Sequence, residues 1–252
     1  MSKLYNLGCS FAYGNCVPER NKLSEEHKGP GTYVAEYFWG NKNEEVNLAC
    51  NGNSLDGILR RLYTEEITSD NVILIGVPPA SRFQIVNNHS EIIYNKVRAG
   101  KSSWGADSEA QNCIKHAFTK GPSRDNDWFL SYKWPEINDT KLVKKIDINE
   151  TASYLLYFNL VKIQTKLKEI GAEYYIYNSV GFFHEPKNVE TLKLKSMVDL
   201  SHYYQPDTDM FSLVKSDEKY ELAEGDQHPN HIAYKEWSYN LCKWIEEKRE
   251  GR

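Results

Sequence analysis

Two short stretches at opposite ends of the chain carry side chains that could act together as a nucleophile and its base. Near the N-terminus, an apolar run from Leu4 to Leu7 is broken by Gly8, and Ser10 follows two residues later. A serine on a sharp turn after a buried strand is held rigidly at the edge of a sheet, which suits a nucleophile. The structural alternative is that Ser10 caps a following helix. Taken alone, this stretch favours the cap.

The second stretch is Asp226-Gln227-His228-Pro229-Asn230, which lies just before the last predicted helix. Histidine is the usual base for a serine nucleophile, and a carboxylate usually fixes its tautomer. His228 and Asp226 are therefore candidates for the base and the acid of a Ser-His-(Asp) system. In most chains an Asp-x-His sequence before a helix serves only capping and the helix dipole.

The elements between these stretches predict the α/β class. Strands are predicted at Leu4–Leu7, Glu45–Cys50, Asn71–Val77 and Tyr174–Tyr177, with a weak fifth at Met210–Val214. Helical patterns cover 32–40, 55–62, 150–170, 190–202 and 233–245. Strands that alternate with helices imply a parallel sheet with right-handed crossovers. We expect a three-layer α/β/α sandwich with a mainly parallel, flavodoxin-like sheet of about five strands.

This topology predicts where a site would form. In open parallel sheets, ligands bind at the carboxyl ends of the strands. The loops after the first three predicted strands would bring Ser10, Gly52 and the segment 76–82 to the same edge.

The middle of the chain, about 83–148, shows poor periodicity and many Gly, Ser, Asp, Asn and Pro residues. A structureless loop of this length is improbable in a compact domain. We interpret it as an insertion with short helices, either a lid over the site or a dimerisation arm, within a single domain that spans 1–252.

Composition excludes several functional classes. The 252 residues carry a formal net charge of -4, without a long block of one sign, which disfavours a nucleic-acid or anionic-membrane surface. The sequence has no apolar run of transmembrane length and no signal-peptide pattern, and its five cysteines are scattered. These features predict a cytoplasmic protein with reduced thiols.

The order of the motifs along the chain resembles the SGNH/GDSL hydrolase family. Gly8-Cys9-Ser10 is similar to the family's Gly-Asp-Ser-like motif after the first strand, with Cys where Asp is common. Asn51-Gly52 matches the glycine after the second strand, and His228-Pro229-Asn230 matches the motif before the last helix. The resemblance spans almost the whole chain except the middle insertion.

The resemblance implies a serine esterase acting on a small acyl ester, such as an O-acetylated carbohydrate, without a cofactor. Ser10, Asp226 and His228 would form the catalytic set, and the amides of Ser10 and Gly52 would hold the oxyanion. Two positions depart from the family pattern. Gly225 stands where the family places its Asp, so Asp226 lies one residue closer to the histidine, and the segment 76–82 lacks the family's Asn donor. Further oxyanion or substrate-binding candidates are Asn53, Ser81 and Arg82.

Other interpretations remain open at this point. Asp226, His228 and His231 could hold a metal, although no second ligand cluster is predicted nearby. The glycines around Ser10 could form a phosphate or FMN loop, but they match neither the Walker nor the Rossmann spacing. The main alternative is a non-catalytic relative that binds a glycan or a protein. We predict a small-molecule or glycan ester as the partner, with no nucleic acid and no membrane, and leave the oligomeric state open.

Overall fold

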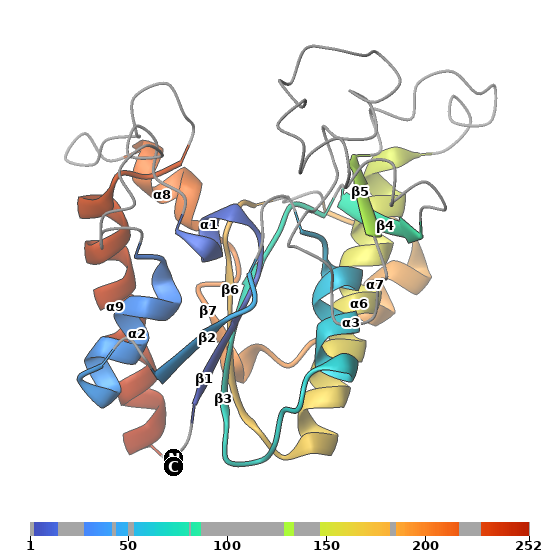
Figure 1. The fold of residues 1–252 in the computed structure, drawn as a ribbon. Helices are drawn as coiled ribbons and strands as arrows, with labels where there is room; N and C mark the ends of the chain where they lie inside the picture. The colour runs from blue at the N-terminus through green and yellow to red at the C-terminus, as the bar shows by residue number, and fades with distance from the viewer. Residues whose placement is uncertain are drawn as a thin grey trace, which may run out of the picture.

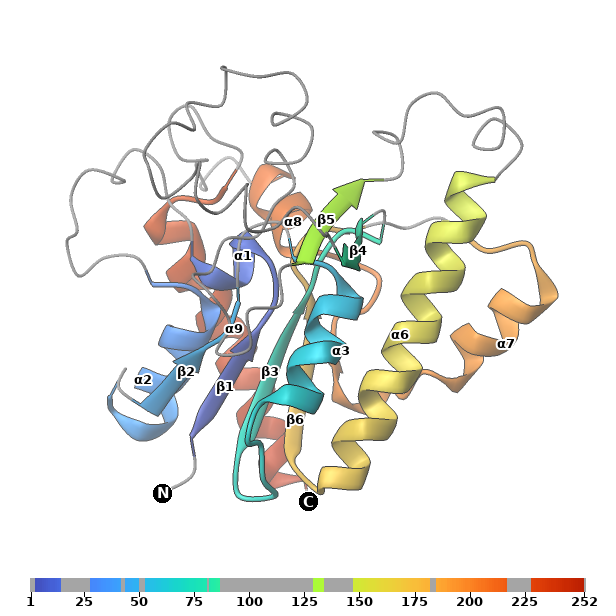
Figure 2. The same cartoon turned by 45° about the vertical axis from the view of Figure 1, so that its right-hand side comes forward.

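A parallel sheet of five strands forms the centre of the molecule (Figures 1 and 2). The computed structural model describes residues 3–14, 28–41, 44–49, 53–80, 82–86, 129–133, 147–181, 185–216 and 228–251. The strands are β1 (Leu4–Leu7), β2 (Glu45–Asn47), β3 (Val72–Val77), β6 (Glu173–Asn178) and β7 (Tyr203–Tyr204). Their spatial order is β2-β1-β3-β6-β7 with parallel pairing throughout. This is the flavodoxin-like order, and it confirms the predicted fold class.

Helices cover both faces of the sheet, which makes three layers (Figure 1). One face carries α2 (Pro30–Trp39), α8 (Met210–Ser216) and α9 (His231–Glu250). The other face carries α3 (Leu55–Thr64) and α6 (Ile148–Ile170), with α7 (Val189–Met197) packed on α6. None of the helices in the described ranges is long and apolar enough to cross a membrane.

The central strand β3 contributes side chains to two hydrophobic cores, one on each face of the sheet. Its six residues are all buried, as expected for a strand covered on both faces. Val72 and Leu74 belong to the core under α2, α8 and α9, whereas Ile73, Ile75 and Val77 belong to the core under α3 and α6. This alternation follows the period of two along a strand.

The predicted strand at Met210–Val214 is wrong, because this segment forms helix α8. The Asp209 carboxylate accepts a hydrogen bond from the Ser212 amide at 2.8 Å, which is an N-terminal capping contact. The fifth strand is instead the two-residue β7, paired with β6 through Ile176 and Tyr177. The helix predicted over 190–202 is also shorter than expected, since α7 ends at Met197 and a separate 3₁₀ turn covers Leu200–His202.

Part of the predicted insertion is described. Strands β4 (Arg82–Val86) and β5 (Phe129–Lys133) pair antiparallel as a small second sheet, with Arg82 opposite Lys133. This pair differs from the short helices that we expected there. Residues 87–128 and 134–146 lie outside the described residues, so the lid and dimerisation-arm interpretations stay predictions.

Candidate active site

Ser10 lies at the carboxyl edge of the sheet, three residues after β1 ends at Leu7. It is the first residue of a single helical turn, α1 (Ser10–Tyr13), and its side chain is buried at 7% exposure. Cys9 occupies the N-cap position, so Ser10 is inside the helix and is not its cap. Gly14 ends the turn with a left-handed φ of 87°, a conformation that glycine adopts at low cost.

A close approach between β1 and β3 fixes where this turn begins. A Cβ atom at Gly8 would lie 2.4 Å from the Ala12 Cβ and 2.8 Å from the Gly76 carbonyl oxygen. Only glycine fits between the serine turn and the end of β3 at this spacing. The sharp break at Gly8 therefore has a packing cause, and it places Ser10 beside β3.

A polar network beneath α1 holds the turn in place. The amide nitrogen of the fully buried Asn6 side chain donates to the Ala12 carbonyl at 2.8 Å and to Glu45 Oε1 at 2.9 Å. The Thr32 hydroxyl donates to the other oxygen of Glu45 at 2.6 Å. The network thus joins the serine turn to β1, β2 and α2. Buried polar groups that are paired in this way favour one arrangement over its alternatives.

The Ser10 hydroxyl oxygen lies 2.7 Å from Nε2 of His228, although the two residues are 218 positions apart in the chain. This distance is within the range expected for a nucleophile and its base. When Nδ1 carries the ring proton, Nε2 accepts the Ser10 hydroxyl proton. The pair can therefore transfer a proton from serine to histidine.

Two neighbouring elements position the imidazole. The Phe11 ring packs on the His228 ring with centroids 4.4 Å apart and planes inclined by 35°. Phe211 from α8 packs edge-on against Phe11 at 5.8 Å. Two residues after His228 in the chain, Asn230 caps α9 by accepting the Ala233 amide at 2.9 Å. The start of α9 therefore fixes the backbone two residues after the histidine.

Asn53, a predicted oxyanion or substrate-binding residue, lies next to the serine turn and is buried. Its side-chain nitrogen donates to the Gly8 carbonyl at 3.2 Å, and its side-chain oxygen accepts from the Ser54 amide at 3.0 Å. These contacts join the start of α3 to the end of β1. They place Asn53 near Ser10, and its oxyanion role stays a prediction.

A buried phenol lies under the same edge of the sheet. Burial, followed by the charge interaction with Cys9, raises the pKa of Tyr177 well above its usual value, and the Ser179 hydroxyl partly offsets this effect. The Tyr177 hydroxyl is 2.7 Å from the point where a Gly76 Cβ would lie. Tyr177 is therefore a neutral group and cannot act as the base at neutral pH.

Several predicted site residues fall outside the described residues or lack a described side chain. Gly52, Ser81 and Asp226 are in the first group, and Arg82 opens β4 with only its backbone described. Within the described ranges, no cluster of three or more His, Cys, Asp or Glu side chains could hold a metal ion. The predicted metal ligands Asp226, His228 and His231 include one residue, Asp226, that lies outside the described residues, so this metal site stays a prediction.

Three residues that support the site were not predicted from the sequence: Asn6, Phe11 and Glu45. Asn6 had a signal, because it is a polar residue inside an apolar strand that enters the core. Phe11 had none, because its partner is 217 positions away.

Comparison with known proteins adds the following findings. The chain matches no protein-family model, and it matches no curated protein. Among solved structures, it is similar to the lipase Lip_vut3 from a goat rumen metagenome, with 15% sequence identity, 96% of each chain covered and a TM-score of 0.49.

Proposed function

We propose that the protein is a serine hydrolase that cleaves a small acyl ester, with Ser10 as nucleophile and His228 as general base. The observation that carries this proposal is the 2.7 Å contact between Ser10 Oγ and His228 Nε2. The contact joins two short motifs from opposite ends of the chain, at the edge of the sheet where ligands of this fold bind. Helix capping does not explain this contact, because Cys9 is the N-cap residue of α1 and Asn230 is the N-cap residue of α9.

The reaction would proceed by acyl transfer to water. His228 takes the hydroxyl proton as Ser10 Oγ attacks the ester carbonyl, and the protonated imidazole then gives this proton to the leaving alcohol. In the second half, His228 deprotonates a water molecule, which attacks the acyl-enzyme, and the proton returns to Ser10 as the acid leaves.

The remaining roles belong to the same proposal. The amides of Ser10 and Gly52 would bind the oxyanion, with Asn53, Ser81 and Arg82 as further donors or substrate contacts. Asp226 would hold the imidazole in its productive tautomer. Each oxyanion donor is typically worth about 10²–10³ in rate.

For the substrate, we propose a short acyl group on a small alcohol, and an O-acetylated carbohydrate is the first class to test. The support is the resemblance to SGNH/GDSL hydrolases, together with the chain's 13% aromatic content, which suits contact with sugar rings.

Labelling with a fluorophosphonate probe tests the nucleophile. The wild-type protein should be labelled once and should turn over aryl acetates, whereas Ser10→Ala and His228→Ala should lose both properties. Ser179→Ala is a matched control, because Ser179 is a buried serine that also follows a strand at this edge of the sheet. Labelling that persists in Ser10→Ala, or a wild-type protein that is neither labelled nor active, would contradict the proposal. The second result would favour the non-catalytic binding module.

A further inference from the structure

A second site is suggested by a pocket of about 580 Å³ at the same edge of the sheet but away from Ser10. It opens between the ends of β3, β6 and β7 and the helices α6 and α7, which lie together on one side of the sheet (Figure 1). Small-molecule sites in proteins typically have volumes of about 300–1,000 Å³. The pocket is therefore large enough for a ligand of ordinary metabolite size.

The pocket is on the other face of the sheet from the candidate catalytic pair. Its wall includes Val77, Leu160 and Val198, which belong to the core under α3 and α6. Phe11, which packs on His228, belongs to the core under α2, α8 and α9. Neither Ser10 nor His228 is among the residues that line this pocket. The two sites can thus be tested separately.

Most of the lining is apolar, and its polar side chains are largely engaged with the protein itself. Asn178 donates to the carbonyls of Pro206 and Thr208 at 2.8 and 3.0 Å and accepts from the Tyr203 hydroxyl at 2.5 Å. The Ser196 hydroxyl donates to the Lys193 carbonyl at 2.7 Å. Such a wall favours an apolar ligand, because these groups gain little from new polar contacts.

The charged groups at the pocket disfavour an anionic ligand. Lys195 pairs with both oxygens of Glu185 at 2.8 and 2.9 Å, and Asp207 adds a second carboxylate. One cation against two anions leaves a net charge of -1 among these three groups. Burial also raises the pKa of Tyr157, so its phenol lines the pocket in the neutral form. A fatty-acid carboxylate would meet repulsion here, whereas a neutral hydroxyl or ester group would not.

We propose that this pocket binds an uncharged small molecule with an alkyl or aryl body, at a site distinct from Ser10 and His228. The proposal does not depend on hydrolase activity, since the pocket is formed by other residues.

The test uses N-phenyl-1-naphthylamine, an uncharged probe whose fluorescence rises in apolar surroundings. The full-length protein should bind one molecule per chain in a saturable way. Ser196 is exposed and lines the pocket, so Ser196→Trp should fill the pocket and weaken binding at least tenfold. Leu192→Trp, from the same helix and also at the pocket, should do the same.

Two control variants define the site. Ser216→Trp matches Ser196→Trp, because Ser216 is also an exposed helical serine whose hydroxyl donates to the carbonyl three residues earlier. It should bind the probe like the wild type, and so should Ser10→Ala. A wild-type protein without saturable binding, or Ser196→Trp and Leu192→Trp variants that fold and bind normally, would overturn the proposal. Loss of binding in Ser10→Ala would place the probe at the catalytic pair and would also overturn it.

Competition tests the chemical class of the ligand. 1-Decanol should displace the probe at least tenfold more effectively than sodium decanoate at pH 8, because the two have similar chains and differ in charge. Equal or stronger displacement by decanoate would contradict the uncharged class.

Discussion

At the scale of single residues, the environment of Ser10 separates the two interpretations that its sequence left open. A capping serine directs its oxygen to a backbone amide at the start of its own helix. The Ser10 oxygen instead lies 2.7 Å from the imidazole of His228, which precedes the last helix. The side chain is also 7% exposed, so few water molecules compete for this contact. Proton transfer between the two groups is therefore favoured by both distance and surroundings.

Phe11 should influence the reaction through the orientation of His228, because their rings pack at 4.4 Å. Phe11→Leu keeps an apolar side chain but removes the flat surface under the imidazole. We expect roughly a tenfold lower rate of fluorophosphonate labelling and a lower kcat with little change in KM, since small displacements of catalytic groups are costly. Labelling kinetics and steady-state hydrolysis of an aryl acetate measure this.

Phe38→Leu is the matched control for this effect. Phe38 packs against the same core, but its ring neighbours are Tyr37, Trp39 and Arg249. It should lower thermal stability without slowing labelling. Equal slowing in both variants would show that the effect of Phe11 is general destabilisation and not ring positioning.

The residues that sequence alone could identify are those with a local signal. Gly8 and Ser10 stand out because a glycine and a polar group interrupt an apolar run, and His228 stands out through its Pro-Asn neighbours. The Asn6–Glu45 bond and the Phe11–His228 contact depend on elements that meet only in the folded chain. No periodicity in the sequence encodes such contacts, and they supply much of the support around the serine turn.

At the scale of elements, the strand and helix types followed from periodicity where the segments were long. The 23 residues of α6 and the fully buried β3 agree with their patterns. The strand prediction at Met210–Val214 was wrong because a run of five residues fits both the helical and the strand period. The N-capping role of Asp209 was also not recognised. The short β7 was missed because two residues carry no periodicity.

The N-cap of α9 should affect both stability and the site, because the cap residue Asn230 is only two residues after His228. The Asn230 side chain accepts the Ala233 amide at 2.9 Å. Asn230→Ala should lower the free energy of unfolding by about 1 kcal/mol. It should also slow labelling of Ser10, since a frayed first turn loosens the backbone that carries the histidine. Urea unfolding and labelling kinetics check the two effects, and Asn230→Ser should restore most of both.

Asn188→Ala is the matched control for Asn230→Ala. Asn188 caps α7 in the same way, accepting from the Glu190 amide at 2.8 Å. This variant should lose a similar amount of stability without slower labelling, because α7 lies on the other side of the sheet from α9 (Figure 1). If Asn188→Ala slows labelling as much as Asn230→Ala does, the cap of α9 has no specific role in the site.

At the scale of the whole molecule, the sheet separates two cores, and each lies beside one of the two proposed sites. The core under α2, α8 and α9 contains Phe11, which packs on His228 of the proposed catalytic pair. The core under α3 and α6 contains Leu160 and Tyr203 and forms part of the second pocket. Both proposed sites lie at the carboxyl edge of the sheet. The β2-β1-β3-β6-β7 order is that of an open parallel sheet, in which ligands bind at this edge. The sequence could predict this edge, since it follows from alternating strands and helices. It could not predict the pocket, which depends on how α7 and β7 pack.

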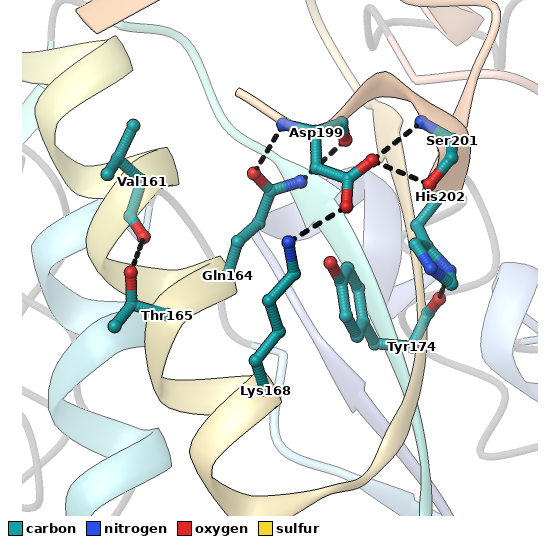
Figure 3. Close-up of polar contacts among 8 residues, drawn as sticks. All are labelled: Val161, Gln164, Thr165, Lys168, Tyr174, Asp199, Ser201 and His202. Carbon is teal, nitrogen blue, oxygen red and sulfur yellow. Dashed lines mark hydrogen bonds and ion pairs between the residues drawn. The ribbon is translucent and has the colours of Figure 1, made fainter. Parts of the chain in front are cut away.

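Asp199 connects α6 to the segment before β7, so its ionisation should affect the stability of the whole fold. Figure 3 shows its carboxylate between the Lys168 ammonium, 2.9 Å from Oδ2, and Ser201, whose amide and hydroxyl donate to Oδ1 at 3.0 and 2.5 Å. Its backbone also exchanges two hydrogen bonds with the Gln164 side chain, at 2.7 and 2.9 Å. The Ser201 hydroxyl, and after it Lys168, lowers the pKa of Asp199 to about 2.

This depressed pKa predicts a pH dependence of stability with a definite sign. In the unfolded chain the pKa of an aspartate is about 4. The pKa of Asp199 in the folded protein is lower, so folding favours the ionised form. The stabilisation is fully present above about pH 4 and is lost as the pH falls through that value toward about 2.

Asp199→Asn should therefore unfold more easily than the wild type at pH 7, by at most about 1 kcal/mol since the group is partly exposed. Urea unfolding from pH 7 down to pH 3 measures the difference, which should shrink below pH 4. Ser201→Ala should reduce this pH dependence more than Lys168→Met does, because the hydroxyl is the larger cause of the shift. A difference between wild type and Asp199→Asn that grows on acidification would show that the carboxylate is not held in its charged form by these contacts.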